Sequence, residues 1–386
     1  MKQYMERILE LLESGMTKAD IARQIIQENN LTTTPETMRV NVSRAIKKHT
    51  NNGVDEVCDD LQVAPSNVPY LWLKTKQASL FIKNPAYRVD EIDYESIISK
   101  CIEGKSPVPK SDWNPGKTID RLVWTDVHVG MDASRKGLAL YATDWNGDLL
   151  NKRVEEMAEF VLANKSSDSL IIDDLGDFMD GWDGETTRKG HKLPQNMTNE
   201  EAFEAGLKAK VLLIDYLAPQ YKNILCNNIC EDNHSGAFGY IVNSAFKHVI
   251  DRKYSNVNVI NHKKFINHYI IGRHGFIISH GKDSRNLKFG FKVQLDPRGV
   301  EKISQYIRHS HDLRSCDYIE FSKGDSHQML FDYCSSDEFD YFNFPAFSPS
   351  SEWVQTNFKK GRSGFVLFQI DLESNRKVVM PYFFLI

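Results

Sequence analysis

Residues 121–128 read RLVWTDVH, a run of apolar and β-branched residues that ends in an Asp-x-His triplet. The same arrangement recurs along the chain: SLIID stands before Gly176-Asp177, NILC before Asn233-His234, GFIIS before His280, and DYIEF before Gly324-Asp325-Ser326-His327. Short runs of this kind are typical of strands buried on both faces. The sequence therefore predicts successive strand ends that each deliver Asp, Asn or His side chains.

A helix is expected between the second and third of these runs, where NEEAFEAGLKAKVLLIDYLA occupies residues 199–218. Strands that alternate with helices predict an α/β layered domain, and ligands gather beyond the strand ends in such sheets. We expect this domain over residues 119–386. Residues 51–118 form a linker and accessory segment, with a hairpin predicted in YLWLKTKQASLFIKN at 70–84.

Three short helices are expected in residues 1–50. Thr17 and Asp20 form a capping-box pattern, and Thr34 followed by Pro35 is typical of a helix start. The third helix carries four basic residues, Arg39, Arg44, Lys47 and Lys48. This arrangement resembles a helix-turn-helix unit, in which those four residues would bind DNA. The alternative is a three-helix module that contacts other proteins.

Composition limits the protein class. The chain has 386 residues, of which 41% are hydrophobic and 26% charged, as in soluble proteins of two or three domains. The net charge of −4 means that any attraction for nucleic acid must come from a local basic surface. No apolar run approaches the ~20 residues that cross a bilayer. An acidic amphipathic start and six scattered cysteines favour a cytoplasmic protein with reduced thiols.

The residues at the strand ends are typical metal ligands. Asp126 and His128 are two positions apart, and side chains at that spacing point the same way on a strand, so both could reach one ion. Gly176 allows a sharp turn that places the Asp177 carboxylate at a strand tip, where its two oxygens can bridge two cations. An amide oxygen such as that of Asn233 is a neutral ligand for a second ion.

These residues, in this order, resemble the calcineurin-like (binuclear) metallophosphoesterases, whose pattern is Asp-x-His, Gly-Asp, Gly-Asn-His-Asp/Glu, a His after a strand, and Gly-His-x-His. The resemblance covers residues 119–330. It implies a layered β-sandwich flanked by helices, here with a small all-α N-terminal domain, and two divalent metal ions. It also implies roles for the matching residues: Asp126, His128 and His327 bind one metal, Asn233 and His280 bind the other, Asp177 bridges them, and His234 is the general acid.

The sequence departs from the family pattern at two positions. Ser235 replaces the carboxylate that normally orients the catalytic His, which leaves Glu231 and Asp232 as candidates for that contact. Asp325 stands where a His normally binds the second metal, and a carboxylate can fill that role. Additional oxygen ligands favour harder ions, so we expect Mn²⁺, with Mg²⁺, Fe and Zn²⁺ as alternatives.

The resembling family includes protein phosphatases, nucleotide phosphodiesterases and DNA nucleases of the Mre11/SbcD type. The helix-turn-helix-like unit favours DNA as the partner, so the expected function is hydrolysis of phosphodiester bonds in DNA through two-metal activation of water. Two alternatives stay open. The first is a phosphatase acting on nucleotides or phosphoproteins, and the second is an inactive DNA-binding or assembly protein.

Two basic residues near the expected ligands are candidate substrate contacts. Arg188 lies in a loop soon after Asp177, and a guanidinium group matches phosphate oxygens bidentately. Lys282 follows His280 by two residues. For both, an exposed side chain without such a role is the alternative, and the same choice applies to His191.

Two further motifs are weaker candidates for a site. His309 and His311 follow a helix-like stretch instead of a strand, so a surface pair is expected. Gly116-Lys117-Thr118 lacks the earlier Gly of a phosphate-binding loop, and a strand follows it where one should precede it.

Overall fold

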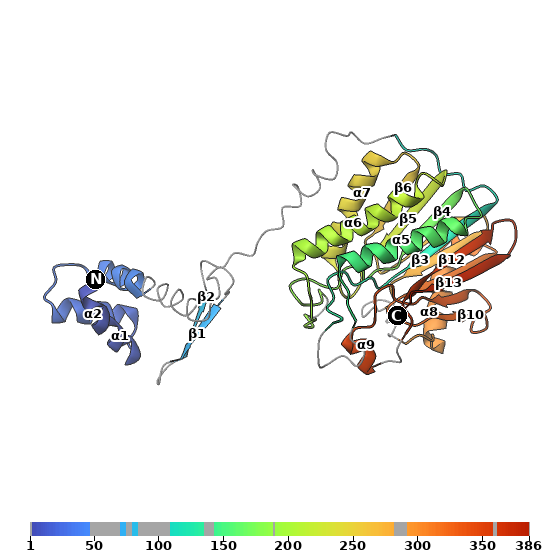
Figure 1. Ribbon diagram of the computed structural model, residues 1–386. Coiled ribbons are helices and arrows are strands. Elements are labelled where there is room, and N and C mark those ends of the chain that lie inside the picture. The colour runs from blue at the N-terminus through green and yellow to red at the C-terminus, as the bar shows by residue number, and fades with distance from the viewer. Residues whose placement is uncertain are drawn as a thin grey trace. The chain divides into compact units, whose positions relative to one another are not determined.

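The chain forms two compact units, Met1–Ile92 and Asp93–Ile386, in the computed structural model (Figure 1). The boundary between them falls inside the predicted accessory segment 51–118. The structure describes residues 2–46, 70–74, 79–83, 109–134, 143–187, 190–281, 292–357 and 361–385.

The first unit contains the three predicted helices and the predicted hairpin. Its elements are η1 (Lys2–Tyr4), α1 (Met5–Glu13), α2 (Lys18–Glu28), a helix over residues 35–46, β1 (Tyr70–Lys74) and β2 (Ser79–Lys83), and the two strands pair antiparallel. Thr17 caps α2 and Thr34 caps the third helix, since each hydroxyl oxygen accepts a backbone N–H three residues on. Ile8, Ile21, Ile25, Met38 and Val42 form the small core of the helices.

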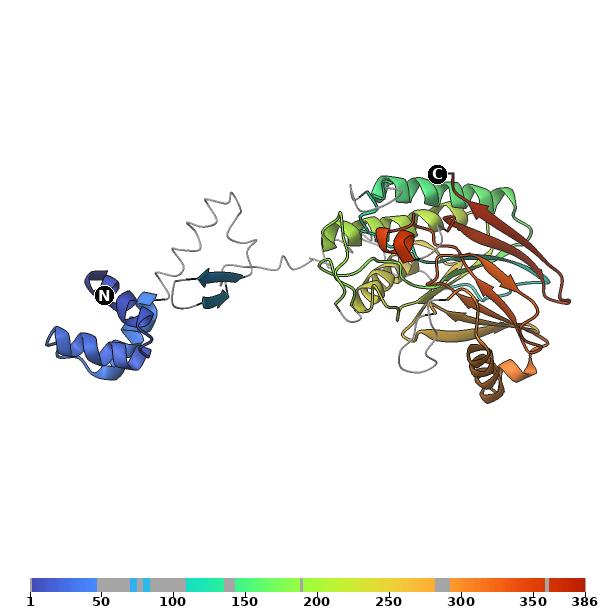
Figure 2. The same ribbon diagram turned by 90° about the horizontal axis from the view of Figure 1, so that it is seen from below.

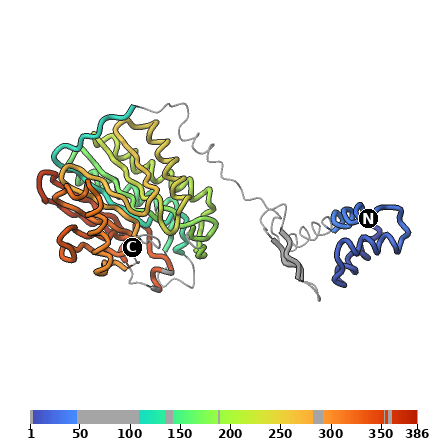
Figure 3. The backbone as a smooth tube through the Cα atoms, turned by 180° about the vertical axis from the view of Figure 1, so that it is seen from behind, coloured from blue at the N-terminus to red at the C-terminus, as the bar shows by residue number. Residues whose placement is uncertain are grey.

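The second unit is built on a six-stranded sheet of order β13-β12-β3-β4-β5-β6. Four strands are parallel: β3 (Thr118–Trp124), β4 (Ser169–Asp174), β5 (Asn223–Ile229) and β6 (Val257–His262). The strands β12 (Gly364–Asp371) and β13 (Lys377–Phe383) complete the sheet, with β12 antiparallel to β3. Figure 3 shows this end of the chain returning beside the earlier strands.

Helices cover one face of this sheet. They are α5 (Gly147–Ala163), α6 (Asn199–Leu217) and α7 (Ala237–Lys253), and all three lie on the same side in Figures 1 and 2. Alternate strand residues such as Leu122, Leu170 and Ile224 pack against them. The helix expected at residues 199–218 is therefore α6, and a complete capping box formed by Thr198 and Glu201 begins it.

A five-stranded sheet of order β10-β11-β9-β8-β7 packs against the other face. Its strands are β7 (Ile266–Ile271), β8 (His274–Ser279), β9 (Tyr318–Lys323), β10 (Leu330–Asp332) and β11 (Asp340–Asn343). The remaining elements are α8 (Pro297–His309), η3 (Leu313–Ser315) and α9 (Glu352–Asn357). Val123, Phe276 and Phe368 belong to the core between the sheets, and α8 covers the outer face of the second sheet through Ile303 and Ile307. The predicted α/β layered sandwich flanked by helices is confirmed.

No helix in the described part of the chain is long and apolar enough to cross a membrane.

A buried ion-pair network joins the two sheets. Arg121 of β3 is fully buried and donates to Asp173 at 2.7 Å and to Glu320 at 3.1 Å. It also donates to the Tyr269 hydroxyl and to Ser322. Because an isolated buried charge is costly, each of these groups depends on the others for compensation. The network therefore ties the first sheet to the second.

We expect Arg121→Met to lower the free energy of unfolding by about 3–5 kcal/mol, because Asp173 loses a buried cationic partner. Urea unfolding of the variant and the parent chain measures the difference. Lys117→Met is the control, because the ion pair of Lys117 with Glu373 is exposed. Equal stability of the two variants would show that the buried network does not hold the sheets together.

Candidate metal centre

The sheet topology brings the predicted ligands to one place. Asp126 and His128 follow β3, Asp177 follows β4, and Asn233 follows β5, and these three strands are parallel neighbours. His280 follows β8, and Asp325 and His327 follow β9, which is parallel to β8. The carboxyl ends of the two parallel sets meet at the same edge of the sandwich, as the side-chain contacts below show. Each of these seven side chains is buried.

One group of donor atoms consists of Asp126, His128 and His327. Asp126 Oδ1 lies 3.1 Å from His327 Nε2 and 3.7 Å from His128 Nε2, and the two Nε2 atoms are 3.2 Å apart. All three ligand atoms lie within 4.8 Å of one another. Two imidazole nitrogens and a carboxylate oxygen that converge in this way can hold a divalent cation.

A second group is centred on Asp177 and His280. Asp177 Oδ2 lies 3.0 Å from His280 Nε2, and Asp325 Oδ1 lies 3.7 Å from the same nitrogen. Asp126, Asp177 and His280 also place their ligand atoms within 4.8 Å of one another. Asp177 makes a further group with His128 and His234, so this carboxylate stands between the two sets.

Unsatisfied polar atoms test whether these residues fit metal ions. Seven buried polar atoms of the centre make no hydrogen bond of good geometry among the described residues, although some of them lie near one another. Four of the seven are potential ligand atoms: Asp126 Oδ1, Asn233 Oδ1, His280 Nε2 and Asp325 Oδ2. Buried polar atoms are nearly always paired, so four together indicate a missing partner. Carboxylate and amide oxygens with imidazole nitrogens suit divalent cations. The donor set therefore fits metal binding.

The backbone at the centre is unusual. Asp126, His128, Asp177, Asp325 and His327 have φ angles of 54°, 48°, 47°, 67° and 53°. Non-glycine residues seldom adopt this left-handed conformation, and they cluster at functional sites when they do. Strand β3 ends at Trp124, so the expectation that Asp126 and His128 share a face through strand alternation was wrong. The turn after the strand makes the two side chains converge instead.

Gly176 forms the sharp turn that the sequence predicts before Asp177. Its φ is 103°, and a Cβ atom there would lie 3.2 Å from both Asp232 Cβ and His280 Cβ. Only glycine combines this conformation with so close an approach. The turn it forms carries Asp177 into the centre.

His234 is held by Asp180, a residue that sequence reasoning did not identify. His234 Nδ1 lies 2.9 Å from the carbonyl oxygen of Asp180 and 3.5 Å from its Oδ1, while Nε2 lies 3.8 Å from Asp177 Oδ2. Asp180 Oδ1 also lies 3.1 Å from His128 Nδ1. Burial alone would raise the pKa of Asp180, but the hydrogen bonds to both histidines lower it. The signal in the sequence was the second Asp of GDFMDG.

Asp232 and Glu231 were candidates for that contact, and the structure corrects this expectation. Asp232 accepts the backbone N–H groups of Asp177, Ser235 and Gly236 at 2.7–3.1 Å. Its carboxylate therefore shapes the turn around Asn233 instead of orienting the His234 ring. Burial and the adjacent Asp177 raise the pKa of Asp232 to about 7. Glu231 is exposed.

Lys210 supports the turn that precedes Asp177, and sequence reasoning did not identify it either. This side chain on α6 is 2% exposed, and its Nζ lies 2.5 Å from Asp174 Oδ2 and 2.9 Å from Asn228 Oδ1. The other oxygen of Asp174 accepts the N–H of Gly176 at 3.0 Å. The buried ion pair therefore fixes the turn that leads into Asp177.

The other predicted residues either lie away from the centre or fall outside the part of the chain that the structure describes. Arg188, Lys282, Lys47 and Lys48 fall outside the described residues. Arg39 is exposed and paired with Glu36 at 2.6 Å, and Arg44 is exposed. His191 is exposed, and so are His309 and His311, as expected for a surface pair.

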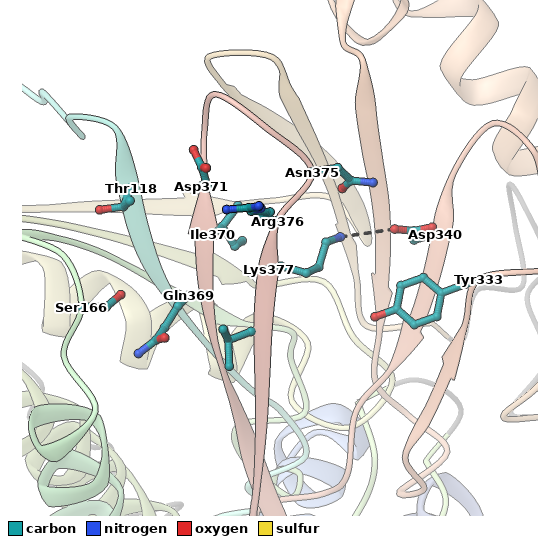
Figure 4. Close-up of a pocket in the computed structure, with 11 residues that line it drawn as sticks. Thr118, Ser166, Tyr333, Asp340, Gln369, Ile370, Asp371, Asn375, Arg376 and Lys377 are labelled. Carbon is teal, nitrogen blue, oxygen red and sulfur yellow. Dashed lines mark hydrogen bonds and ion pairs between the residues drawn. The ribbon is translucent and has the colours of Figure 1, made fainter.

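A pocket of about 770 Å³ lies at the opposite end of β3 from Asp126. Thr118, the first residue of β3, lines it together with residues from β11, β12 and β13 (Figure 4). Its partly buried cation, Lys377, is already paired with Asp340 at 3.2 Å and with Glu320 at 2.8 Å. Because it lies at the other end of β3, the pocket is separate from the candidate metal centre.

No protein-family model and no curated protein matches the sequence. Among solved structures, the chain is similar to a putative 5′-nucleotidase from Staphylococcus aureus, with 12% identity over 68% of this chain and 54% of that one and a TM-score of 0.29. It is similar to the sulfate thiohydrolase SoxB of Thermus thermophilus, with 7% identity over 71% and 58% and a TM-score of 0.31.

A third similar structure is the calcineurin-like phosphoesterase YfkN of Bacillus subtilis, with 9% identity over 66% of this chain and 84% of that one and a TM-score of 0.26. The chain spans little more than half the length of the first two structures. With TM-scores this low, any assignment of function depends on the side chains of the centre itself.

Proposed function

We propose that this protein is a metal-dependent phosphoesterase that hydrolyses phosphodiester bonds, with DNA as its substrate. The observation that carries the proposal is a set of three overlapping donor groups, in which Asp126 and Asp177 each belong to two groups. His234 lies beside the shared Asp177 carboxylate, and its side chain is 20% exposed, so a substrate can reach it. A buried ligand cluster next to an accessible histidine suits hydrolysis of a charged ester.

The residues of the centre take distinct roles in this proposal. Asp126, His128 and His327 would hold one cation, Asn233, His280 and Asp325 would hold the other, and Asp177 would contribute its charge to both. When bound, two such cations polarise phosphoryl oxygens and lower the pKa of a coordinated water. Turns with left-handed backbone and buried hydrogen bonds constrain the proposed ligands.

His234 is the proposed proton donor to the leaving oxygen. Its Nδ1–H group donates to the Asp180 carbonyl oxygen, which leaves Nε2 directed at Asp177 and the centre. Asp180 is the positioning residue, because it fixes the ring through one nitrogen while the other is free to act. Asp180 thus orients His234 through its carbonyl oxygen, with its carboxylate 3.5 Å away, although Ser235 replaces the usual orienting carboxylate.

DNA is favoured over a free nucleotide because of the N-terminal helices. Arg39 and Arg44 are exposed on the third helix, as a DNA-binding role requires. A nucleotide phosphatase fits the centre itself equally well, and an inactive binding protein is the third reading. Hydrolysis of bis-p-nitrophenyl phosphate, tested with Mn²⁺, Mg²⁺ and Zn²⁺ and abolished by a chelator, supports the phosphoesterase. We expect the highest rate with Mn²⁺, and no hydrolysis with any metal would refute an enzymatic role.

Removal of residues 1–50 is expected to weaken DNA binding and to flatten its salt dependence, because the basic third helix is lost. Hydrolysis of bis-p-nitrophenyl phosphate should persist, since every proposed ligand lies beyond Ile119. Fluorescence anisotropy with labelled DNA at several salt concentrations measures the first effect. If the truncated protein binds as tightly as the full chain with the same salt slope, the helix-turn-helix interpretation is wrong.

A further inference from the structure

The turn between β6 and β7 lies beside the second donor set. Its first end is tied to the ligand loop, since the His262 carbonyl oxygen accepts the N–H of Cys230 at 3.0 Å. Its other end is tied to a proposed ligand, since the Phe265 carbonyl oxygen accepts the N–H of His280 at 3.3 Å. Lys263 and Lys264 stand between these two anchors, and both are exposed. Two lysines are therefore held at the rim of the centre.

Tyr240 fixes the position of one of these lysines. Lys263 Nζ lies 4.0 Å from the centroid of the Tyr240 ring, a distance at which an ammonium group and an aromatic ring attract. Tyr240 stands on the first turn of α7, where its N–H contacts the Gly236 carbonyl oxygen at 3.4 Å. Gly236 is two residues from His234. The Tyr240–Lys263 pair is thus attached to the same loop as the proposed proton donor.

Neither Lys263 nor Lys264 forms an ion pair with a carboxylate of the described residues. Other exposed lysines of this unit do form ion pairs, for example Lys117 with Glu373 and Lys222 with Asp168. Glu231, which follows Cys230 in the ligand loop, is exposed and forms no ion pair with Lys263 or Lys264. Two ammonium groups that no described carboxylate neutralises, at the edge of an acidic centre, are suited to binding an anion.

We propose that Lys263, Lys264 and Tyr240 bind the backbone phosphates that flank the scissile phosphate of an oligonucleotide. This proposal rests on the phosphoesterase function and specifies its substrate as a strand with consecutive phosphates. Adjacent cations match the successive charges of a nucleic-acid backbone, and an aromatic ring beside them adds a surface for a base or sugar. A small diester has no flanking phosphate and gains nothing from this rim.

The test compares Lys263→Gln/Lys264→Gln with the parent full-length chain on two substrates. We expect the KM for a single-stranded oligonucleotide to rise about ten-fold, with kcat unchanged, since two phosphate contacts are lost. The kinetic constants for bis-p-nitrophenyl phosphate should be unchanged. In fluorescence anisotropy with EDTA present, the slope of log affinity against log salt should become shallower by about 1.4, at ~0.7 per phosphate contact on a single strand.

Lys152→Gln/Lys208→Gln is the matched control, because both lysines are exposed on α5 and α6. This variant should keep the parent KM and salt slope. Tyr240→Leu should raise the oligonucleotide KM by less than the double lysine variant, because it releases Lys263 without removing its charge.

The two substrates test the rim residues Lys263, Lys264 and Tyr240 separately from the metal centre. If bis-p-nitrophenyl phosphate is hydrolysed but the rim variant matches the control in KM and salt slope, the rim proposal fails and the phosphoesterase function stands. If the parent chain hydrolyses neither substrate, the phosphoesterase function fails, and the proposed substrate-positioning role fails with it.

Discussion

Asp177→Asn should abolish turnover and remove most of the bound metal. Asp177 is the carboxylate that belongs to ligand groups with both His128 and His280, so its charge contributes to both donor sets. An amide has one neutral oxygen where the carboxylate has two charged ones, and a divalent cation binds it more weakly. We expect hydrolysis of bis-p-nitrophenyl phosphate to fall to background. Metal content of the purified protein, measured by mass spectrometry, should fall in parallel.

Asp183→Asn provides a matched control for this variant. Asp183 also has a left-handed backbone, with a φ of 51°, but it is exposed and hydrogen-bonded to Asn199 outside the centre. Asn tolerates that conformation as well as Asp does. The control should therefore keep parental activity and metal content. Full activity and unchanged metal in Asp177→Asn would exclude the binuclear centre.

The candidate ligands could be picked out from the sequence because each follows a recognisable strand. A short buried run ending in Asp, Asn or His is a local pattern, and parallel strands bring such ends together without further information. The way in which the side chains converge could not be predicted from such local patterns. Asp126 and His128 converge because the chain turns into the left-handed region after Trp124, and the sequence signals no such turn at those residues.

The residues that support the centre and the sheets could not be predicted for a different reason. Asp180, Lys210 and Arg121 act on partners between 18 and 201 positions away in the chain, as the contacts with His234, Asn228 and Ser322 show. No periodicity or short motif encodes such distant pairing. A buried lysine on α6 reads in sequence as one more polar residue of an amphipathic helix. Only the packing of α6 behind β4 and β5 reveals that it fixes the turn before Asp177.

His234→Asn should reduce turnover while leaving the metal content unchanged, because His234 is proposed to act on the leaving oxygen. General acid catalysis contributes typically ~10²–10⁴-fold, so a loss of this size is expected on DNA. The alkoxide released from DNA needs a proton, whereas p-nitrophenolate is a stable anion that hardly does. Hydrolysis of bis-p-nitrophenyl phosphate should therefore fall much less than cleavage of labelled DNA.

Asp180→Asn distinguishes positioning from proton transfer at the same histidine. The main-chain carbonyl oxygen of Asp180 still accepts from His234 Nδ1 in this variant, so the ring keeps one anchor but loses the carboxylate 3.5 Å away. We expect a smaller loss than for His234→Asn, with the same preference for the better leaving group. His191→Asn, which changes an exposed histidine, should have no effect on either substrate. Equal and small losses on both esters in His234→Asn, with metal retained, would show that His234 does not protonate the leaving group.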